Sequence, residues 1–261
     1  MAISTLAREV TPRLDAPRPY TSIGVVAPFD FALDRELWHL VPEDVTLHLT
    51  RTPYIDLALG VELASELSDE EAVGAGARAL SVVWPAVTVY LCTSGSFVNG
   101  LAGESALREA MEARGAVRAV TTGGALLEAL AALGLRRVGV GTPYDRTLTV
   151  RLERFLADGG FEPVQLAYLG LTGNVPQVST ETVRELARAA CTDDAEVVFL
   201  SCTNLPTIDV LSELEAELGK PVLSANLVSI WSALRSLGAL PTKRPERLLR
   251  HEEWTEQPTA G

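Results

Sequence analysis

The sequence predicts an α/β protein built from two similar halves, and three observations support this fold class. Short valine-rich apolar runs alternate with longer stretches of helical periodicity along most of the chain. The central runs lack polar alternation, which is typical of parallel strands buried on both faces. Two motifs of the first half recur in the same order in the second. We therefore expect mainly parallel sheets in two pseudo-symmetric, doubly wound halves, with the active site in the cleft between them.

Strands and helices are expected to alternate from residue 21 to residue 240. The strands are predicted at 22–27, 45–51, 87–91, 117–120, 137–141, 164–169, 197–201 and 222–224. The helices are predicted at 32–41, 69–84, 100–114, 123–134, 146–159, 179–191, 206–219 and 226–239. Ser68, followed by Glu71, has the pattern of a capping box that opens the second of these helices. Gly134 and Gly219 occupy positions where helices commonly end.

The repeat divides the chain into domains. Gly24-Val-Val-Ala-Pro-Phe-Asp30 is similar to Gly139-Val-Gly-Thr-Pro-Tyr-Asp145, and each segment follows a strand and precedes a helix. The second pair is Cys92-Thr-Ser and Cys202-Thr-Asn, each at the end of an apolar strand. The domains that we expect are an N-terminal arm (1–20), a first half (21–120 plus 225–240), a second half (121–224) and a C-terminal tail (241–261).

Composition and charge argue against several classes of partner. The chain has 261 residues, of which 47% are hydrophobic and 21% are charged, as in globular proteins. Its formal net charge of -12 argues against nucleic acids and anionic membrane surfaces, because both select basic proteins. No apolar stretch is long enough to span a membrane, and residues 1–20 lack the apolar core of a signal peptide, so a cytoplasmic location is expected. The apolar last helix leaves a homo-oligomer as an open alternative.

The two Cys-Thr motifs contain the candidate catalytic groups. A turn of small and hydroxyl residues between a strand and a helix exposes N–H groups that bind anions, and the helix dipole lowers the pKa of a neighbouring thiol. Because parallel strands of two facing halves end at a shared cleft, we expect Cys92 and Cys202 on its opposite walls. A buried, unreactive thiol is the alternative for each cysteine, and we assign it to Cys191.

Other polar residues are weaker candidates for the active site than the two cysteine motifs. Tyr144 can hydrogen-bond a substrate carboxylate, or it is an ordinary tyrosine. Asn226 is expected to be the N-cap of the last helix. The histidines lack an acid partner at a recognisable spacing, so a Ser/His/Asp triad is not supported. No Cys/His metal pattern and no dinucleotide or Walker motif is present, so we expect neither a metal nor a cofactor.

The motifs resemble the maleate cis-trans isomerases, which are grouped with the arylmalonate decarboxylases in the aspartate/glutamate racemase superfamily. The resemblance covers residues 20–240. It rests on Tyr90-Leu-Cys-Thr-Ser-Gly-Ser-Phe97, Gly141-Thr-Pro-Tyr144, Leu200-Ser-Cys-Thr-Asn-Leu205 and Lys220-Pro-Val-Leu-Ser-Ala-Asn226. It implies a cofactor-independent enzyme in which Cys92 is the nucleophile, Cys202 its partner acid or base, and Tyr144 a carboxylate-binding residue.

One segment departs from the family pattern. Maleate isomerases usually carry an asparagine shortly after the first strand, where this chain has Pro28-Phe-Asp-Phe31. Asp30 would repel a dicarboxylate unless it is protonated or turned away, although it could bind the ammonium group of an amino acid. The decarboxylases of this family have a small residue in place of the first cysteine, so Cys92 argues against decarboxylation.

The expected activity is therefore cis-trans isomerisation of maleate or a related small enedioate by reversible addition of the Cys92 thiolate. The alternatives are a two-cysteine racemase, an arylmalonate decarboxylase-like enzyme, and a non-catalytic module that binds small dicarboxylates. Cys92 and Cys202 are the expected catalytic residues. The expected substrate-binding residues are Asp30, Thr93, Ser94, Gly95, Ser96, Tyr144, Thr203 and Asn204.

Overall fold

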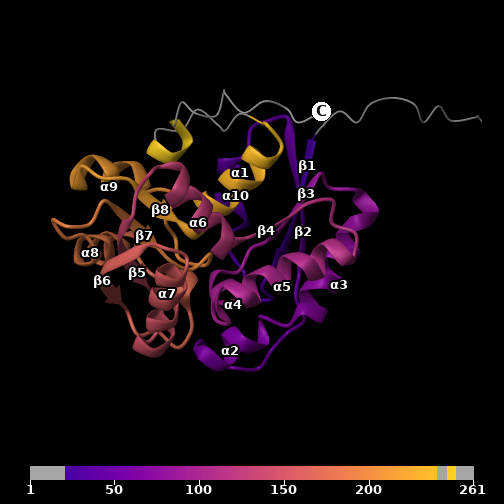
Figure 1. Cartoon of the computed structure of the whole chain (residues 1–261), viewed down its shortest axis with the longest axis horizontal. Helices are drawn as coiled ribbons and strands as arrows, with labels where there is room; N and C mark the ends of the chain where they lie inside the picture. Colours follow the sequence, from indigo (N-terminus) through magenta and orange to yellow (C-terminus); the bar gives the residue numbers. More distant parts are fainter. Residues whose placement is uncertain (1–20, 240–245, 251–261) are drawn as a thin grey trace, which may run out of the picture.

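The computed structural model describes residues 21–239 and 246–250, which form two α/β halves side by side (Figure 1). Each half contains a four-stranded, entirely parallel sheet, with the order β2-β1-β3-β4 in the first and β6-β5-β7-β8 in the second. The strands are β1 (Thr21–Ala27), β2 (Val45–Arg51), β3 (Val87–Tyr90), β4 (Ala119–Thr121), β5 (Arg137–Thr142), β6 (Glu162–Tyr168), β7 (Val197–Leu200) and β8 (Val222–Ser224). The identical strand order confirms the predicted fold class.

Helices cover both faces of each sheet. The α-helices are α1 (Asp34–Leu40), α2 (Val61–Glu66), α3 (Glu70–Leu80), α4 (Thr93–Phe97), α5 (Gly100–Ala113), α6 (Thr122–Ala132), α7 (Arg146–Asp158), α8 (Thr180–Ala190), α9 (Leu211–Leu218) and α10 (Ala225–Ser236). Short 3-10 helices are η1 (Ser81–Val83), η2 (Val175–Gln177) and η3 (Arg247–Arg250). No helix in the described ranges has the length and apolar character needed to cross a membrane.

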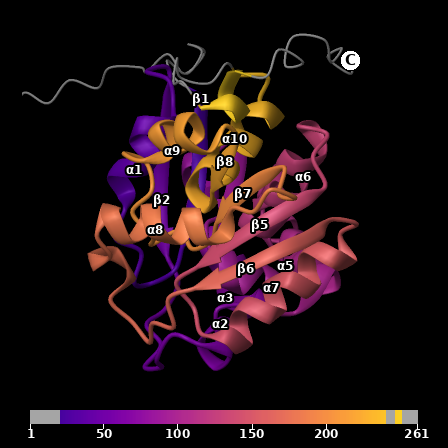
Figure 2. The same ribbon diagram turned by 90° about the vertical axis from the view of Figure 1, so that its left-hand side faces the viewer.

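The two halves are joined by their helices. In the second half α8 packs on β5, β6 and β7, and α9 packs on β8 (Figure 2). Helix α10 follows β8 but packs against α6, α1, β3 and β4, so the chain returns to the first half after completing the second sheet. Helix α4 contacts both α6 and α7, and it carries the first Cys-Thr motif into the space between the halves.

Central strands are buried because layers cover both of their faces. All residues of β3 and β7 are buried, which explains why both sequences are apolar apart from Thr88 in β3. The predicted arm (1–20), residue 240 and most of the predicted tail lie outside the described residues. Within that tail, however, η3 buries Leu248 and Leu249, and the Arg247 N–H donates to Glu215 at 2.9 Å. This part of the tail therefore belongs to the folded body.

Some predicted boundaries were wrong. Helix α9 begins at Leu211 and not at Pro206, because residues 203–208 bind the first half instead of forming a helical turn. Asp69, not Ser68, caps α3, and the Ser68 hydroxyl accepts a hydrogen bond from the Asn99 amide at 2.6 Å. Helices α2 and α4 were missed because six and five residues are too few to show helical periodicity.

Candidate active site

Cys92 lies two residues beyond β3 and caps α4. Its Sγ accepts the Gly95 N–H at 3.4 Å and lies 3.9 Å from the Ser94 hydroxyl. Burial raises the pKa of the Cys92 thiol, although the Gly95 N–H and the hydroxyls of Tyr90 and Ser94 act to lower it. The expectation that the helix terminus lowers this pKa below its ordinary value was wrong, because desolvation of the thiolate outweighs the donors.

Gly95 is required because the Tyr90 hydroxyl, the Leu67 carbonyl and the Cys92 sulfur all lie close to the position that a Cβ atom would take. A Cβ atom at this position would lie 2.7 Å from the Tyr90 hydroxyl and 3.1 Å from Cys92 Sγ. The Tyr90 hydroxyl donates a short hydrogen bond to the carbonyl of Leu67, and the tyrosine is fully buried. Tyr90 therefore belongs to the environment of Cys92, a role that its place in an apolar strand did not reveal.

Cys202 occupies the matching position, two residues beyond β7, but with a different backbone. Its φ of 87° lies in the left-handed region, which costs a residue with a side chain about 1–3 kcal/mol and marks many functional sites. Burial raises the pKa of the half-buried Cys202 thiol to about 12, and the negative charges of Cys92 and Asp30 contribute. Hydrogen bonds from the Asn204 N–H and the Tyr144 hydroxyl act to lower the pKa of Cys202.

The structure brings the two cysteine loops together. The Thr203 hydroxyl, next to Cys202, donates to the carbonyl of Leu91, next to Cys92, at 3.4 Å. Tyr144 is buried, and its hydroxyl accepts a hydrogen bond from the hydroxyl of Ser201, next to Cys202, at 3.3 Å. Burial raises the pKa of Tyr144 well above its ordinary value, and the charges of both cysteines raise it further. Tyr144 is therefore close to both thiols.

Asp30 places a negative charge beside this cluster. It lies on the turn between β1 and α1, and although the residue is exposed, partial desolvation of its carboxyl group raises the pKa of Asp30. The charge of Asp30 in turn raises the pKa of Tyr90, Cys92 and Cys202. An electrostatic effect on all three groups shows that the carboxylate is near the cleft.

Two predicted substrate contacts are engaged by the protein itself. The Asn204 side chain accepts the Ala32 N–H at 2.9 Å and donates to the Asp30 carbonyl at 3.2 Å, so it fastens its loop to the first half. The Ser96 hydroxyl donates to the Thr93 carbonyl and accepts the Gly123 N–H, both at 2.8 Å, and links α4 to α6. These two side chains shape the loops, because their hydrogen-bonding groups already have protein partners.

Thr93 differs from Asn204 and Ser96. Its hydroxyl oxygen is buried but has no hydrogen-bond partner among the described residues. Thr93 and Ser94 are also the first two residues of α4, where backbone N–H groups have no acceptor within the helix. The start of α4 thus retains donors that a ligand beside Cys92 can use.

Glu36 and Asn226 join the site from distant parts of the chain. Asn226 was predicted to be an N-cap, but the Ser224 hydroxyl caps α10 by accepting the Leu227 N–H at 3.3 Å. The Asn226 amide instead donates to Glu36 and to the Thr203 carbonyl, each at 2.9 Å. Sequence analysis missed Glu36 because its partners lie more than 170 residues further along the chain.

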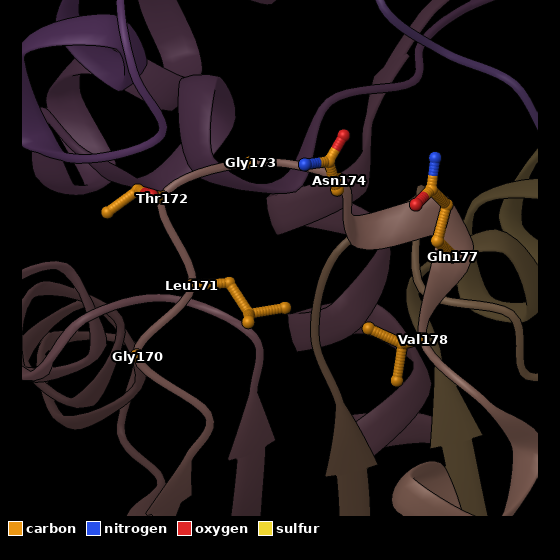
Figure 3. A pocket seen from close by; sticks show the side chains of 7 residues that line it. All are labelled: Gly170, Leu171, Thr172, Gly173, Asn174, Gln177 and Val178. Carbon is orange, nitrogen blue, oxygen red and sulfur yellow. The ribbon is translucent and has the colours of Figure 1, made fainter.

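A separate hollow of about 480 Å³ lies on the loop that follows β6 (Figure 3). The Gly170 N–H donates to the Tyr144 carbonyl at 3.0 Å, which ties this loop to the site. Its lining side chains are uncharged, and the polar ones labelled in Figure 3 are those of Thr172, Asn174 and Gln177. Within the part of the chain that the structure describes, no group of three His, Cys, Asp or Glu side chains could hold a metal ion.

Comparisons with known proteins agree with this architecture. The family model for arylmalonate decarboxylase matches residues 56–247. Arylmalonate decarboxylase from Bordetella bronchiseptica is 35% identical over 213 residues, which cover 79% of this chain and 89% of that protein. Maleate isomerase from Nocardia farcinica is 33% identical over 178 residues, which cover 64% of this chain and 70% of that protein.

Solved structures show the same relationship. A double variant of arylmalonate decarboxylase in its liganded form has a TM-score of 0.81 and 30% identity, and the match covers 89% of this chain and 99% of that one. A cysteine-to-serine variant of the Nocardia farcinica maleate cis-trans isomerase, with a covalently bound succinylcysteine intermediate, has a TM-score of 0.75 and 25% identity, with coverages of 88% and 98%. The chain is therefore an enzyme of the maleate isomerase and arylmalonate decarboxylase family.

Proposed function

We propose that this enzyme is a cofactor-independent cis-trans isomerase of maleate or a related small enedioate. The observation that carries the proposal is a pair of thiols on two loops that are joined by the hydrogen bond from Thr203 to the Leu91 carbonyl. The Gly95 N–H donates to the sulfur of Cys92, and the Ser94 hydroxyl lies 3.9 Å from that sulfur. These contacts offset part of the burial that raises the pKa of the Cys92 thiol, and we assign Cys92 as the nucleophile, whereas a thiol with a pKa of about 12 suits Cys202 as a proton donor.

The reaction begins when the Cys92 thiolate adds to one alkene carbon and a C–S bond forms. The electron pair of the π bond moves to the other carbon and is delocalised into the neighbouring carboxylate. Cys202 gives its proton to that carbon, and the central bond, now single, can rotate. The Cys202 thiolate then removes the proton, the C–S bond breaks, and the trans product leaves with both thiols in their starting states.

Donors at the start of α4 would hold one substrate carboxylate. The Thr93 hydroxyl, which has no partner in the described part of the chain, and the backbone N–H groups of Thr93 and Ser94 lie directly after the nucleophile. Hydrogen bonds to charge that develops in the transition state are among the largest contributions to catalysis. Tyr144, next to both thiols, would bind the second carboxylate.

Two further observations favour isomerisation. The Nocardia farcinica isomerase structure contains a succinylcysteine intermediate, the adduct that addition of a thiol to maleate produces. Cys92 itself also favours this activity, because the resemblance assigns the decarboxylases a small residue at that position.

An arylmalonate decarboxylase-like activity is the second candidate, and the apolar surroundings of Cys92 favour it. Val26, Leu63 and Leu67 are buried in the same cluster as Cys92, and Phe29 and Ile55 pack against it. Such a wall suits an aryl or alkyl substituent better than a second carboxylate. Decarboxylation also needs only one proton donor, which Cys202 could supply to the carbanion that remains after carbon dioxide leaves.

One experiment distinguishes the isomerase from the decarboxylase. The enzyme is incubated with maleate and, in a parallel sample, with phenylmalonate, and proton NMR follows fumarate and phenylacetate. We expect fumarate to form and a mass gain of one maleate to localise to the peptide that contains Cys92. Phenylacetate without fumarate would replace the isomerase proposal with the decarboxylase, and exchange of the α-proton of an amino acid in deuterated water would indicate a racemase.

A further inference from the structure

A buried carboxylate of the first half holds the loop that follows Cys202 in the second half. Glu36, in α1, is only 6% exposed. Its Oε1 accepts the Thr207 N–H at 2.8 Å and the Ile208 N–H at 3.2 Å. Its Oε2 accepts the Asn226 amide at 2.9 Å and the Thr207 hydroxyl at 3.4 Å. Glu36 therefore binds four donors, all from the second half or from α10.

These hydrogen bonds lead to the backbone of Cys202. The Asn226 amide that donates to Glu36 also donates to the carbonyl of Thr203 at 2.9 Å. Thr203 directly follows Cys202, whose φ of 87° is unfavourable and persists only where the surroundings hold it. No helix stabilises this loop locally, because α9 does not begin until Leu211. Glu36, acting through Asn226, thus restrains the peptide after Cys202, in addition to the hydrogen bonds that the Thr203 and Asn204 side chains make to the first half.

We propose that Glu36 is a positioning residue for Cys202: through Asn226 and residues 207–208 it holds the peptide after Cys202 so that the half-buried sulfur keeps its place beside Cys92. The inference rests on the proposed role of Cys202 as the acid. Burial raises the pKa of Glu36, but all four of its partners are donors, so the carboxylate form matches the site. A protonated or amide side chain would direct a donor at another donor.

The chain offers a matched control in Glu215. This residue is 4% exposed and also accepts two backbone N–H groups, from Val222 at 3.1 Å and from Arg247 at 2.9 Å. It joins α9 to β8 and η3 and makes no hydrogen bond to the cysteine loops. Glu36→Gln and Glu215→Gln therefore make the same chemical change in similar buried settings, but only the first acts on the Cys202 loop.

The test measures thiol reactivity, so it does not depend on knowing the substrate. The full-length variants are alkylated with iodoacetamide over a range of pH, and peptide mass spectrometry gives separate rates for Cys92, Cys191 and Cys202. Release of the loop in Glu36→Gln exposes the half-buried Cys202 further to water, so the pKa of Cys202 falls towards its ordinary value while Asp30, Cys92 and Tyr144 are unchanged. A fall of one unit makes alkylation at pH 8 about tenfold faster, because the thiolate fraction rises by that factor.

Glu215→Gln is the control, and we expect it to leave the pH profile of Cys202 alkylation unchanged even if the melting temperature of this variant falls.

Asn226→Ala should reproduce the faster alkylation of Cys202. The double variant with Glu36→Gln should add little, because both substitutions break the same connection. The single Asn226→Ala variant also serves as the test if Glu36→Gln does not fold. An unchanged Cys202 profile in a folded Glu36→Gln or Asn226→Ala protein would overturn the proposal and leave these residues with a structural role only. Full turnover by Cys202→Ala would instead overturn the proposed function, and the alkylation result would be unaffected.

Discussion

The two cysteine loops occupy equivalent places in two sheets of identical strand order, yet they are stabilised differently. The Cys92 loop passes directly into α4, with φ of -142° at the cysteine, and the donors to its sulfur come from the first half itself. The Cys202 loop has a left-handed backbone and is tied to the first half through Asn204, Thr203 and Glu36. The repeat places two sulfur atoms at one cleft, but the contacts between halves determine what each can do.

The other repeated motif shows the same divergence. Asp145 caps α7 by accepting the Leu148 N–H at 2.8 Å. Its counterpart Asp30 caps no helix, because α1 begins only at Asp34, and its charge acts on the thiols instead. Tyr144 has a hydroxyl near both sulfurs where the first half has Phe29. A small shift in where a helix begins therefore converts a capping residue into a charged group of the site.

The largest expected effect comes from removing each sulfur in turn. Cys92→Ala should abolish turnover of maleate and the covalent adduct, because the nucleophile is lost. Cys202→Ser should lower turnover by about 10²–10⁴-fold, the usual contribution of a positioned acid, while the adduct on Cys92 still forms. Turnover and intact-protein mass are measured on samples that circular dichroism shows to be folded. Equal behaviour of the two variants would contradict the assigned roles.

The matching glycines should differ strongly in their effect on stability. A Cβ atom at Gly139 would lie 2.1 Å from the Ala190 carbonyl oxygen, which belongs to the backbone, whereas one at Gly24 would lie 3.0 Å from a side-chain atom of Pro85. Gly139→Ala should lower the free energy of unfolding by about 3 kcal/mol or more, and Gly24→Ala by about 1 kcal/mol. Urea denaturation of both variants checks this. Similar midpoints would show that the second half can relax around the added methyl group.

The thiols of the unmodified enzyme should also differ in their response to pH. Thiolate is the reactive form, so a pKa raised to about 12 keeps Cys202 unreactive until the solution is strongly alkaline. The alkylation rate of Cys202 should therefore rise about tenfold per pH unit up to at least pH 10, while that of Cys92 levels off earlier. If Cys202 reached its plateau first, the assignment of Cys92 as nucleophile would be reversed.

The smallest effect is expected from substituting Asp30 and its repeat counterpart Asp145. Asp30→Asn removes a negative charge that raises the pKa of both thiols, so alkylation at pH 8 should become about two- to fivefold faster and the KM for maleate should fall by a similar factor. Asp145→Asn keeps a good capping residue and should change neither quantity. Equal responses to the two substitutions would show that Asp30 does not act on the site through its charge.

The sequence alone determined the fold class, the parallel sheets and the equivalent placement of Cys92 and Cys202. These features depend on local periodicity and on the repeat, both of which are visible along the chain. The start of α9, the true cap of α10, the engagement of Asn204 and Ser96 by protein groups, and the role of Glu36 emerged only in the tertiary structure. Each depends on hydrogen bonds between residues distant in sequence, such as the bond from Asn226 to Glu36. The raised pKa of both thiols likewise required the structure, because desolvation depends on which elements cover the sulfur, and no local motif records that.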